Sequence, residues 1–431
     1  MQTITKTEPI KNKLIAAFEP LKNSLFGDAK IRLQALSSFD QQGIPNRKSE
    51  EYKYVNVELI LKDNFELQTS QTLTPEQVKS KKILKNSIVV VLENGVFSEK
   101  LSAIGSLPNG LTILDIQQAK SNAAFSSTYA TLADVQSDAF IALNTALAQG
   151  GVFIQIADNT IIESPVHVIH ISSASSNTII NPRLFIHVGN NAQVNLVQSF
   201  ETVNSTAKTF NNTVTELAIG EKSVVNHYQI EDEGEYGHLL NTTQTYQKAD
   251  SVFSTHVFTL SGSFVRNNLN MVLDDEHIES HLYGLYLTND HQVVDNHTLV
   301  DHRKPNCNSN ELYKGIIEDK SSATFNGKIF VRKDAQQTNA FQSNKNILLS
   351  DDGTINTKPQ LEIYANDVKC SHGTSTGKLD EDKIFYLRAR GLSEESAKKM
   401  LMHAFASEMV ETVKLDNLRD YIEEKISKRF E

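Results

Sequence analysis

The chain has few cysteines, no long hydrophobic run and no excess of basic charge. Its two cysteines, Cys307 and Cys370, are too few for a disulfide framework. The longest β-like apolar run, Ile88–Leu92, falls far short of the roughly 20 residues that a membrane-spanning helix needs. The 52 acidic residues outnumber the 42 basic ones, which are scattered, so nucleic-acid and membrane-surface binding are disfavoured. Because Met1–Pro9 also lacks a signal-peptide core, we expect a soluble cytoplasmic protein.

The 431 residues are enough for two or three domains, and their pattern changes twice. Residues 1–150 are mixed, with a helix expected over Ala139–Ala148 and a strand, an Asn-Gly turn and a returning strand over Ser87–Phe97. From 151 to 377, short β-branched runs follow one another with almost no helical periodicity. Residues 378–431 return to helical spacing. We therefore expect an N-terminal mixed α/β region, a β-rich core and a C-terminal helical domain.

Within the β-rich core, a polar turn, a small residue and alternating apolar positions recur. The pattern occurs at Asn191–Val194, Glu221–Val224 and Ala249–Val252, roughly 30 residues apart as in a solenoid, and again at Asp319–Ala323. Small residues after turns suit coils that stack closely, while alternating Val, Ile and Phe fill the interior. The pattern predicts a mainly β fold with an irregular parallel β-helix core. Pairs of hairpins in a β-sandwich could give a similar period.

Three helices are expected after residue 378. Asp380 is suited to cap the first, which carries Ile384 and ends near Gly391. Ser393 is suited to cap the second, and Leu415–Phe430 is a third amphipathic stretch. Such helices either close the end of a solenoid or dock a partner.

Cys370 and His372 stand two residues apart in a strand-like segment, so their side chains are expected on one face. A thiolate beside an imidazole suits a soft or borderline metal such as iron or zinc. Two ligands do not complete a tetrahedral site, so a metal here would need donors from elsewhere. The alternative is a core thiol beside a hydrogen-bonded histidine.

The stretch Gly373–Leu379 superficially resembles a nucleotide-binding P-loop. It has three residues between its glycines instead of four, and Leu379 stands where Ser or Thr would hold magnesium. We therefore expect a Gly/Ser/Thr turn between strand and helix, and any ATP hydrolysis linked to this protein would occur on another chain.

Other polar clusters give weaker signals. The histidines between His227 and His302 show no specific metal-ligand spacing. The acidic clusters Glu231–Glu233 and Asp274–Glu276 are expected to be solvated turns rather than catalytic carboxylates. Cys307 is expected to be a small buried residue. The candidate metal ligands are therefore Cys370 and His372.

Several segments match a known family in order along the chain: Gly43–Pro45, Lys48–Tyr54, Cys307–Ser309, Phe325–Gly327, Asn346–Ser350, Lys358–Gly373 and Ile384–Gly391. Together they resemble the SufB/SufD family of the SUF iron–sulfur cluster assembly system, with Tyr52 in place of the usual Trp. The motif Lys369–His372 is similar to the SufD branch, since the SufB branch carries a glutamate-containing motif there.

The resemblance implies a right-handed parallel β-helix flanked by helical regions. It implies a SufB-like paralogue joined through the end of the β-helix and a SufC-like ATPase held by the C-terminal helices. The nascent iron–sulfur cluster would form at the interface with the paralogue, where His372 matches a proposed ligand and Cys370 lies in the same motif. Reduced flavin is associated with such complexes, but no flavin motif is present in this sequence. An isolated chain could also form a homodimer.

We therefore expect a non-enzymatic scaffold subunit that holds iron or a transient Fe–S cluster through His372, with Cys370 assisting. A β-helix polysaccharide lyase or hydrolase is the enzymatic alternative, which predicts a secretion signal and a charged cluster along one groove. A homomeric zinc-binding module is a third hypothesis, which predicts stoichiometric zinc on the isolated chain.

Overall fold

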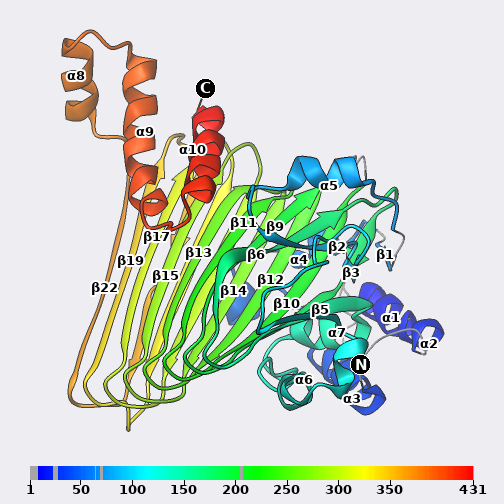
Figure 1. Cartoon of the computed structure of the whole chain (residues 1–431). Coiled ribbons are helices and arrows are strands. Elements are labelled where there is room, and N and C mark those ends of the chain that lie inside the picture. The colour runs from blue at the N-terminus through cyan, green and yellow to red at the C-terminus, as the bar shows by residue number, and fades with distance from the viewer. Residues whose placement is uncertain (1–7, 23–27, 64, 68–70, 204–206, 431) are drawn as a thin grey trace.

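The computed structural model describes residues 8–22, 28–63, 65–67, 71–203 and 207–430. Over most of this length the chain is a solenoid whose successive strands alternate between two sheets (Figure 1). Most strands pair in parallel with the strand one coil earlier and the strand one coil later. This pairing confirms the mainly β, parallel β-helix fold. It excludes a sandwich of hairpins, in which neighbouring strands would be antiparallel.

The two sheets are defined by their strands. Sheet 1 contains β1 (Glu66–Leu67), β4 (Leu111–Asp115), β5 (Gly150–Ile156), β7 (Thr178–Ile180), β8 (Pro182–Val188), β10 (Thr209–Ile219), β12 (Gly237–Gln247), β14 (Phe264–Leu273), β16 (Val293–His302), β18 (Ser322–Val331), β20 (Thr354–Thr357) and β21 (Gln360–Ile363). Sheet 2 contains β2 (Ile88–Glu93), β3 (Val96–Phe97), β6 (Ile161–Ser172), β9 (Gln193–Thr202), β11 (Val224–Asp232), β13 (Val252–Ser261), β15 (Glu279–Thr288), β17 (Asn308–Ile317), β19 (Thr338–Leu348) and β22 (Val368–Gly377).

The recurring polar turns form one corner of the solenoid. Asn191, Lys222 and Asp250 have φ of 52°, 56° and 57°, so each turn reverses direction through a left-handed residue. The N–H groups of Asn191 and Lys222 donate to carbonyls in the next coil's turn, at 2.8 and 2.9 Å. The turn at Asp319 lies at the opposite corner, where its carboxylate accepts from the N–H of Asp290 at 3.0 Å. The roughly 30-residue period therefore reports one stacked corner, and the similar turn at Asp319 belongs to the other corner.

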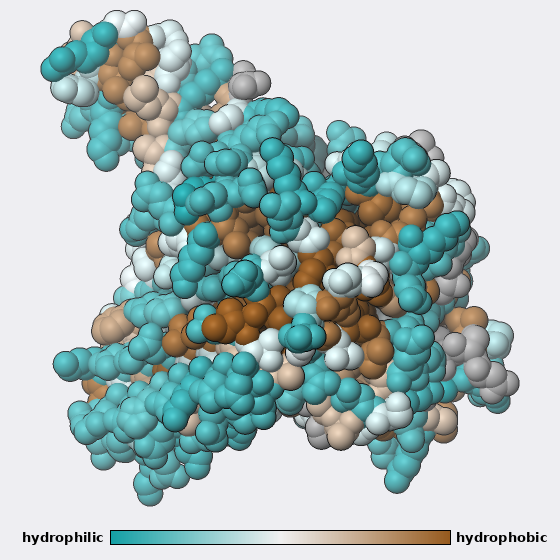
Figure 2. Space-filling model, in the orientation of Figure 1, coloured by the Kyte–Doolittle hydropathy of each residue, from teal (hydrophilic) through white to brown (hydrophobic). Residues whose placement is uncertain are grey.

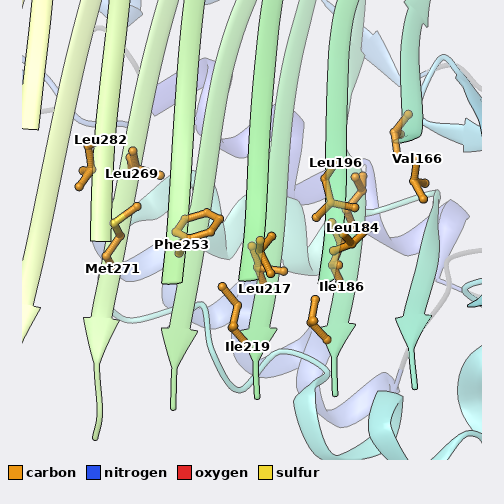
Figure 3. Close-up of a cluster of buried hydrophobic side chains, with 14 of the residues drawn as sticks. Val166, Leu184, Ile186, Leu196, Leu217, Ile219, Phe253, Leu269, Met271 and Leu282 are labelled. Carbon is orange, nitrogen blue, oxygen red and sulfur yellow. The ribbon is translucent and has the colours of Figure 1, made fainter. Parts of the chain in front are cut away.

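The solenoid interior is filled by alternate side chains of both sheets. Figure 3 shows one part of it, where Leu184, Leu217 and Met271 from sheet 1 face Leu196 and Phe253 from sheet 2. All five are at most 1% exposed. Burying each such side chain contributes about 1.5–3 kcal/mol before entropy costs, so stacked coils stabilise one another.

The N-terminal region starts the solenoid and covers its first coils. Its helices are α1 (Glu8–Ala16), α2 (Phe18–Leu21), α3 (Ala29–Gln42), η1 (Glu50–Tyr52), α4 (Val57–Leu61), α5 (Pro75–Lys81), η2 (Gln118–Ser121), α6 (Ala123–Thr128) and α7 (Ala139–Leu147). The expected hairpin is present as β2 and β3, and the expected helix as α7. β2 also pairs in parallel with β6, and β4 pairs antiparallel with β5, so both sheets extend into this region.

Three C-terminal helices follow the last strand, as the capping pattern predicts: α8 (Glu381–Ala389), α9 (Glu394–Val410) and α10 (Asp416–Phe430). Asp380 accepts from two N–H groups of α8, and Ser393 accepts from the N–H of Ser396 at 3.1 Å. α9 and α10 pack on the outer face of sheet 2, whereas α8 projects beyond the sheets with the first turns of α9 (Figure 1).

The turn expected over Gly373–Gly377 is wrong. These residues continue β22, where hydrogen bonding to β19 overrides the weak strand preference of Gly373 and Gly377. Gly373–Gly377 therefore form a strand and not a phosphate-binding loop. Within the described ranges, no helix is long and apolar enough to span a membrane.

Candidate functional site

The candidate ligands lie on the last coil of the solenoid. We define the terminal coil as residues 354–377, which include β20, β21 and β22. β22 pairs with β19 in a register that sets Cys370 beside Ala340 and His372 beside Gln342. In the described part of sheet 2, β22 has no strand on its other side. Its outer backbone N–H and C=O groups are therefore available to a partner strand.

Cys370 is half-buried at this open end. It packs against an apolar cluster that includes Ile329, Ala340 and Ala365. Burial raises the pKa of its thiol, so the thiol is protonated near neutral pH. Cys370 can therefore serve as a ligand only after it loses this proton.

His372 differs from its neighbour because it is exposed. Its strand position matches that of Cys370, two residues away, so the alternation of β22 places both on the same face. Among the described residues it has no hydrogen bond or ion pair. Its ring is therefore free to bind a metal without breaking an existing contact.

An open groove of about 480 Å³ lies along β22 and β19; His372 is among its lining residues, but most of its lining comes from the strand face opposite to the one that Cys370 and His372 share. Ser371 and Gly373 line it from β22, and Phe341 and Lys345 line it from β19. Phe341 is 44% exposed, so this end of the solenoid presents apolar surface as well as unpaired backbone. Both features are typical of an uncovered interface.

The ligand set is incomplete on this chain. In the part of the chain that the structure describes, no three His, Cys, Asp or Glu side chains come together as a metal-binding group. Of the clustered histidines, His302 is buried and contacts the hydroxyl of Ser309 at 2.9 Å, while His297 contacts Asp295 on the outer face of sheet 1. These histidines serve structural contacts in separate places.

The solvated turn expected at Glu231–Glu233 is also wrong. Glu231 and Glu233 are at most 1% exposed and point into the solenoid. Burial raises the pKa of each to about 7, while hydrogen bonds from Thr259 to Glu231 and from Thr202 to Glu233 oppose the rise. A run of acidic residues in a strand places alternate members inside, which composition alone does not reveal.

A second exposed feature is the arm, which we define as residues 381–400 of α8 and the start of α9. Phe385, Tyr386 and Met400 are 74%, 58% and 49% exposed. Figure 2 shows apolar surface among hydrophilic atoms on this projecting part. The amphipathic pattern identified these helices, but it did not reveal that Phe385 faces solvent while Ile384 is buried.

Exposure of the two cysteines predicts their reactivity. Cys370 is expected to react with iodoacetamide much faster than Cys307 in the native chain, because Cys307 is 0% exposed and burial raises its pKa to about 11. The rate at Cys370 should rise with pH as its thiolate forms. Peptide mass spectrometry over a time course measures both rates, and equal rates would contradict the half-buried placement.

Comparison with known proteins extends over nearly the whole chain. The family model for the SUF system FeS cluster assembly SufBD core domain matches residues 170–405, and the model for the SufBD protein N-terminal region matches residues 23–168. The iron–sulfur cluster assembly protein SufD of Escherichia coli is 28% identical over 400 residues, which cover 92% of each chain.

Two further relatives agree. The iron–sulfur cluster assembly SufBD family protein slr0076 of Synechocystis is 32% identical over 79% of this chain and 77% of its own. The chloroplastic protein ABCI7 of Arabidopsis thaliana is 25% identical over 87% of this chain and 80% of its own. With two family models that together span the solenoid and its N-terminal cover, the chain belongs to the SufBD family of SUF iron–sulfur cluster assembly proteins.

Proposed function

We propose that this chain is a non-enzymatic SufD-type scaffold subunit that pairs with a SufB-like paralogue through the terminal coil. In this role His372 donates to iron or to the nascent cluster, and Cys370 assists. The supporting observation is the edge of β22, which no strand among the described residues pairs with and which carries both residues at the open end of the solenoid. A second solenoid could add its own edge strand there by backbone hydrogen bonding.

The incomplete ligand set fits a shared site. A tetrahedral iron or cluster iron takes four donors, and this chain supplies at most two. Ligation requires a neutral imidazole and a deprotonated thiol, so binding at Cys370 releases a proton. The remaining donors would come from the partner. Iron and the cluster are cargo in this scheme, which is consistent with a site that stays open.

We further propose that the arm docks a SufC-like ATPase. Its exposed Phe385, Tyr386 and Met400 would form the apolar centre of that interface. α9 also links the arm to the strands beside the site: Lys314 of β17 donates to the carbonyl of Phe405 at 2.7 Å, and Lys345 of β19 pairs with Glu408 at 3.7 Å. β19 pairs directly with β22, so movement of the arm can reach the terminal coil.

Co-expression tests the assignment. The chain should co-purify with the SufB-like and SufC-like proteins of its own organism, and the complex should retain iron after anaerobic reconstitution. Recovery of neither partner would overturn the proposal. Stoichiometric zinc on the isolated chain would favour the zinc module, and sugar release from a polyuronate would favour the β-helix enzyme. The isolated chain is expected to be a homodimer or a monomer, which light scattering distinguishes.

A charged residue on the arm should weaken binding of the ATPase without affecting binding of the SufB-like partner. Phe385→Asp is expected to reduce recovery of the ATPase by about tenfold or more, because a carboxylate replaces an apolar contact at the centre of the interface, while the SufB-like partner is retained. Ile161→Asp is the matched control, since Ile161 is 62% exposed on β6, away from the arm. Equal loss of ATPase in both variants would contradict docking on the arm.

We place the chain in the cytoplasm, because its two cysteines are unpaired and one is fully buried. Reduced flavin has no role in this proposal.

A further inference from the structure

Two of the motifs singled out in the sequence contact each other in space. Glu50, in the Lys48–Tyr54 motif, forms an ion pair with Lys358, which opens the Lys358–Gly373 motif 308 positions later. Lys358 lies at the break between β20 and β21, within the terminal coil. The proposed metal site does not explain the Lys48–Tyr54 motif. Its contact with the terminal coil suggests a structural role for that motif.

The N-terminal segment Glu50–Tyr52, which we call the strap, is anchored to the solenoid at one end. Tyr52 is 3% exposed, and its hydroxyl donates to Asp138 at 2.8 Å. The guanidinium of Arg266 lies 3.9 Å from the centre of the Tyr52 ring and donates to the carbonyl of Glu51 at 2.9 Å. Arg266 is itself held by an ion pair with Asp295. This end of the strap is therefore rigid.

The middle of the strap is held by His297. Its Nε2 lies 2.9 Å from Asp295, and its Nδ1 lies 3.2 Å from the carboxylate of Glu51. The imidazole ring therefore lies between the two carboxylates, with one ring nitrogen in contact with each. The hydrogen bond from His297 holds the pKa of Glu51 below its usual value, although burial opposes the shift. Glu51 is therefore ionised near neutral pH.

From Glu51 the contacts continue to the last coil. Asn326 of β18 donates to the Glu51 carboxylate at 3.2 Å, and Gln360 of β21 donates to the side-chain oxygen of Asn326 at 2.8 Å. The strap thus crosses β14, β16 and β18 to reach the terminal coil. Leu361, next to Gln360, packs on the same apolar cluster as Cys370.

The terminal coil has fewer pairing partners than the inner coils. Every inner coil is covered on both sides, whereas β20 and β21 have four residues each and pair only with β18 in the described part of sheet 1. Short strands with neighbours on one side open easily. From these contacts we infer that Glu50 and Glu51 are positioning residues, which fasten the terminal coil and so hold Cys370 and His372 in place for the partner.

Hydrogen–deuterium exchange on the isolated full-length chain tests the strap. Glu51→Gln is expected to speed exchange of amides 354–377 by about tenfold, because it removes the charge on which His297 and Asn326 converge. Glu50→Lys and Lys358→Glu should each speed it by a smaller factor, and the double reversal should restore slow exchange. Asp351→Asn is the matched control, since it removes an exposed ion pair with Lys378 that does not involve the strap.

Capture of the SufB-like partner tests whether the strap positions the terminal coil for binding. This test rests on the proposed function. Glu51→Gln should weaken capture, and the Glu50/Lys358 double reversal should recover it relative to either single reversal. Unchanged exchange in Glu51→Gln overturns the strap. So does faster exchange in Glu50→Lys and Lys358→Glu that the double reversal of this pair fails to restore. Faster exchange with normal capture overturns its positioning role. If the wild-type chain captures no partner, the proposed function fails, and the exchange result still decides whether the strap fastens the terminal coil.

Discussion

His372→Ala is expected to lower the iron content of the reconstituted complex by roughly tenfold or more, because in the proposed shared site it removes one donor, which costs at least as much as disturbing a donor's supporting contacts. The complex itself should still assemble. His372 is exposed and makes no hydrogen bond or ion pair with the described residues, so its removal leaves the backbone edge of β22 unchanged.

The measurement is iron per complex after anaerobic reconstitution and gel filtration. His291→Ala is the control, because His291 is also exposed and lies in a turn remote from β22. Cys370→Ser should give a smaller loss, and acid should release iron from the wild type because a protonated imidazole cannot ligate. Full iron content in His372→Ala would remove the residue from the ligand set.

Arg183→Ala is expected to destabilise the fold by about 3–5 kcal/mol, because it leaves a buried carboxylate without its counter-charge. Arg183 and Glu216 are both at most 1% exposed, and the guanidinium Nε donates to Glu216 at 3.0 Å. Arg183 also donates to Asn144 of α7 at 3.2 Å, and Glu216 accepts from the N–H groups of Leu132 and Ala133. The pair therefore joins the N-terminal cover to sheet 1.

Urea unfolding followed by circular dichroism measures this effect. The double variant Arg183→Met/Glu216→Leu should recover part of the lost stability, because apolar residues of similar size leave no unpaired charge, whereas the N–H groups of Leu132 and Ala133 lose their acceptor. Lys378→Ala, which removes one partner of an exposed ion pair, should leave the midpoint unchanged. If Arg183→Ala behaves like Lys378→Ala, the buried pair does not stabilise the junction.

The sequence predicts those parts of the fold that depend on local pattern. The turns at Asn191, Lys222 and Asp250 are recognisable because each coil repeats the same corner with a small residue after it. Asp380 and Ser393 are recognisable because an N-cap acts within three residues. The common face of Cys370 and His372 follows from strand alternation alone.

Features that depend on stacking between coils are not predictable in this way. Glu231 and Glu233 lie inside because the register sets hydroxyl and amide partners around them, such as Thr259 at 2.6 Å from Glu231. The contact of Glu50 with Lys358 joins residues 308 positions apart. Likewise, only the arrangement of strands shows that β22 has an edge left free by the described part of the chain, and this property makes His372 a candidate interface ligand.

That free edge also bears on the fate of the chain in the cell. At the opposite end of the solenoid, antiparallel β3 and β4 close the two sheets and the N-terminal helices cover them. At β22 nothing on the described chain plays that part, so an incoming subunit would serve as the missing end cap. An orphan copy, made in excess of its partner, would expose a template for self-association. If the proposed partner exists, the lifetime of such copies would follow its supply, and degradation of uncapped copies would keep the two subunits in balance.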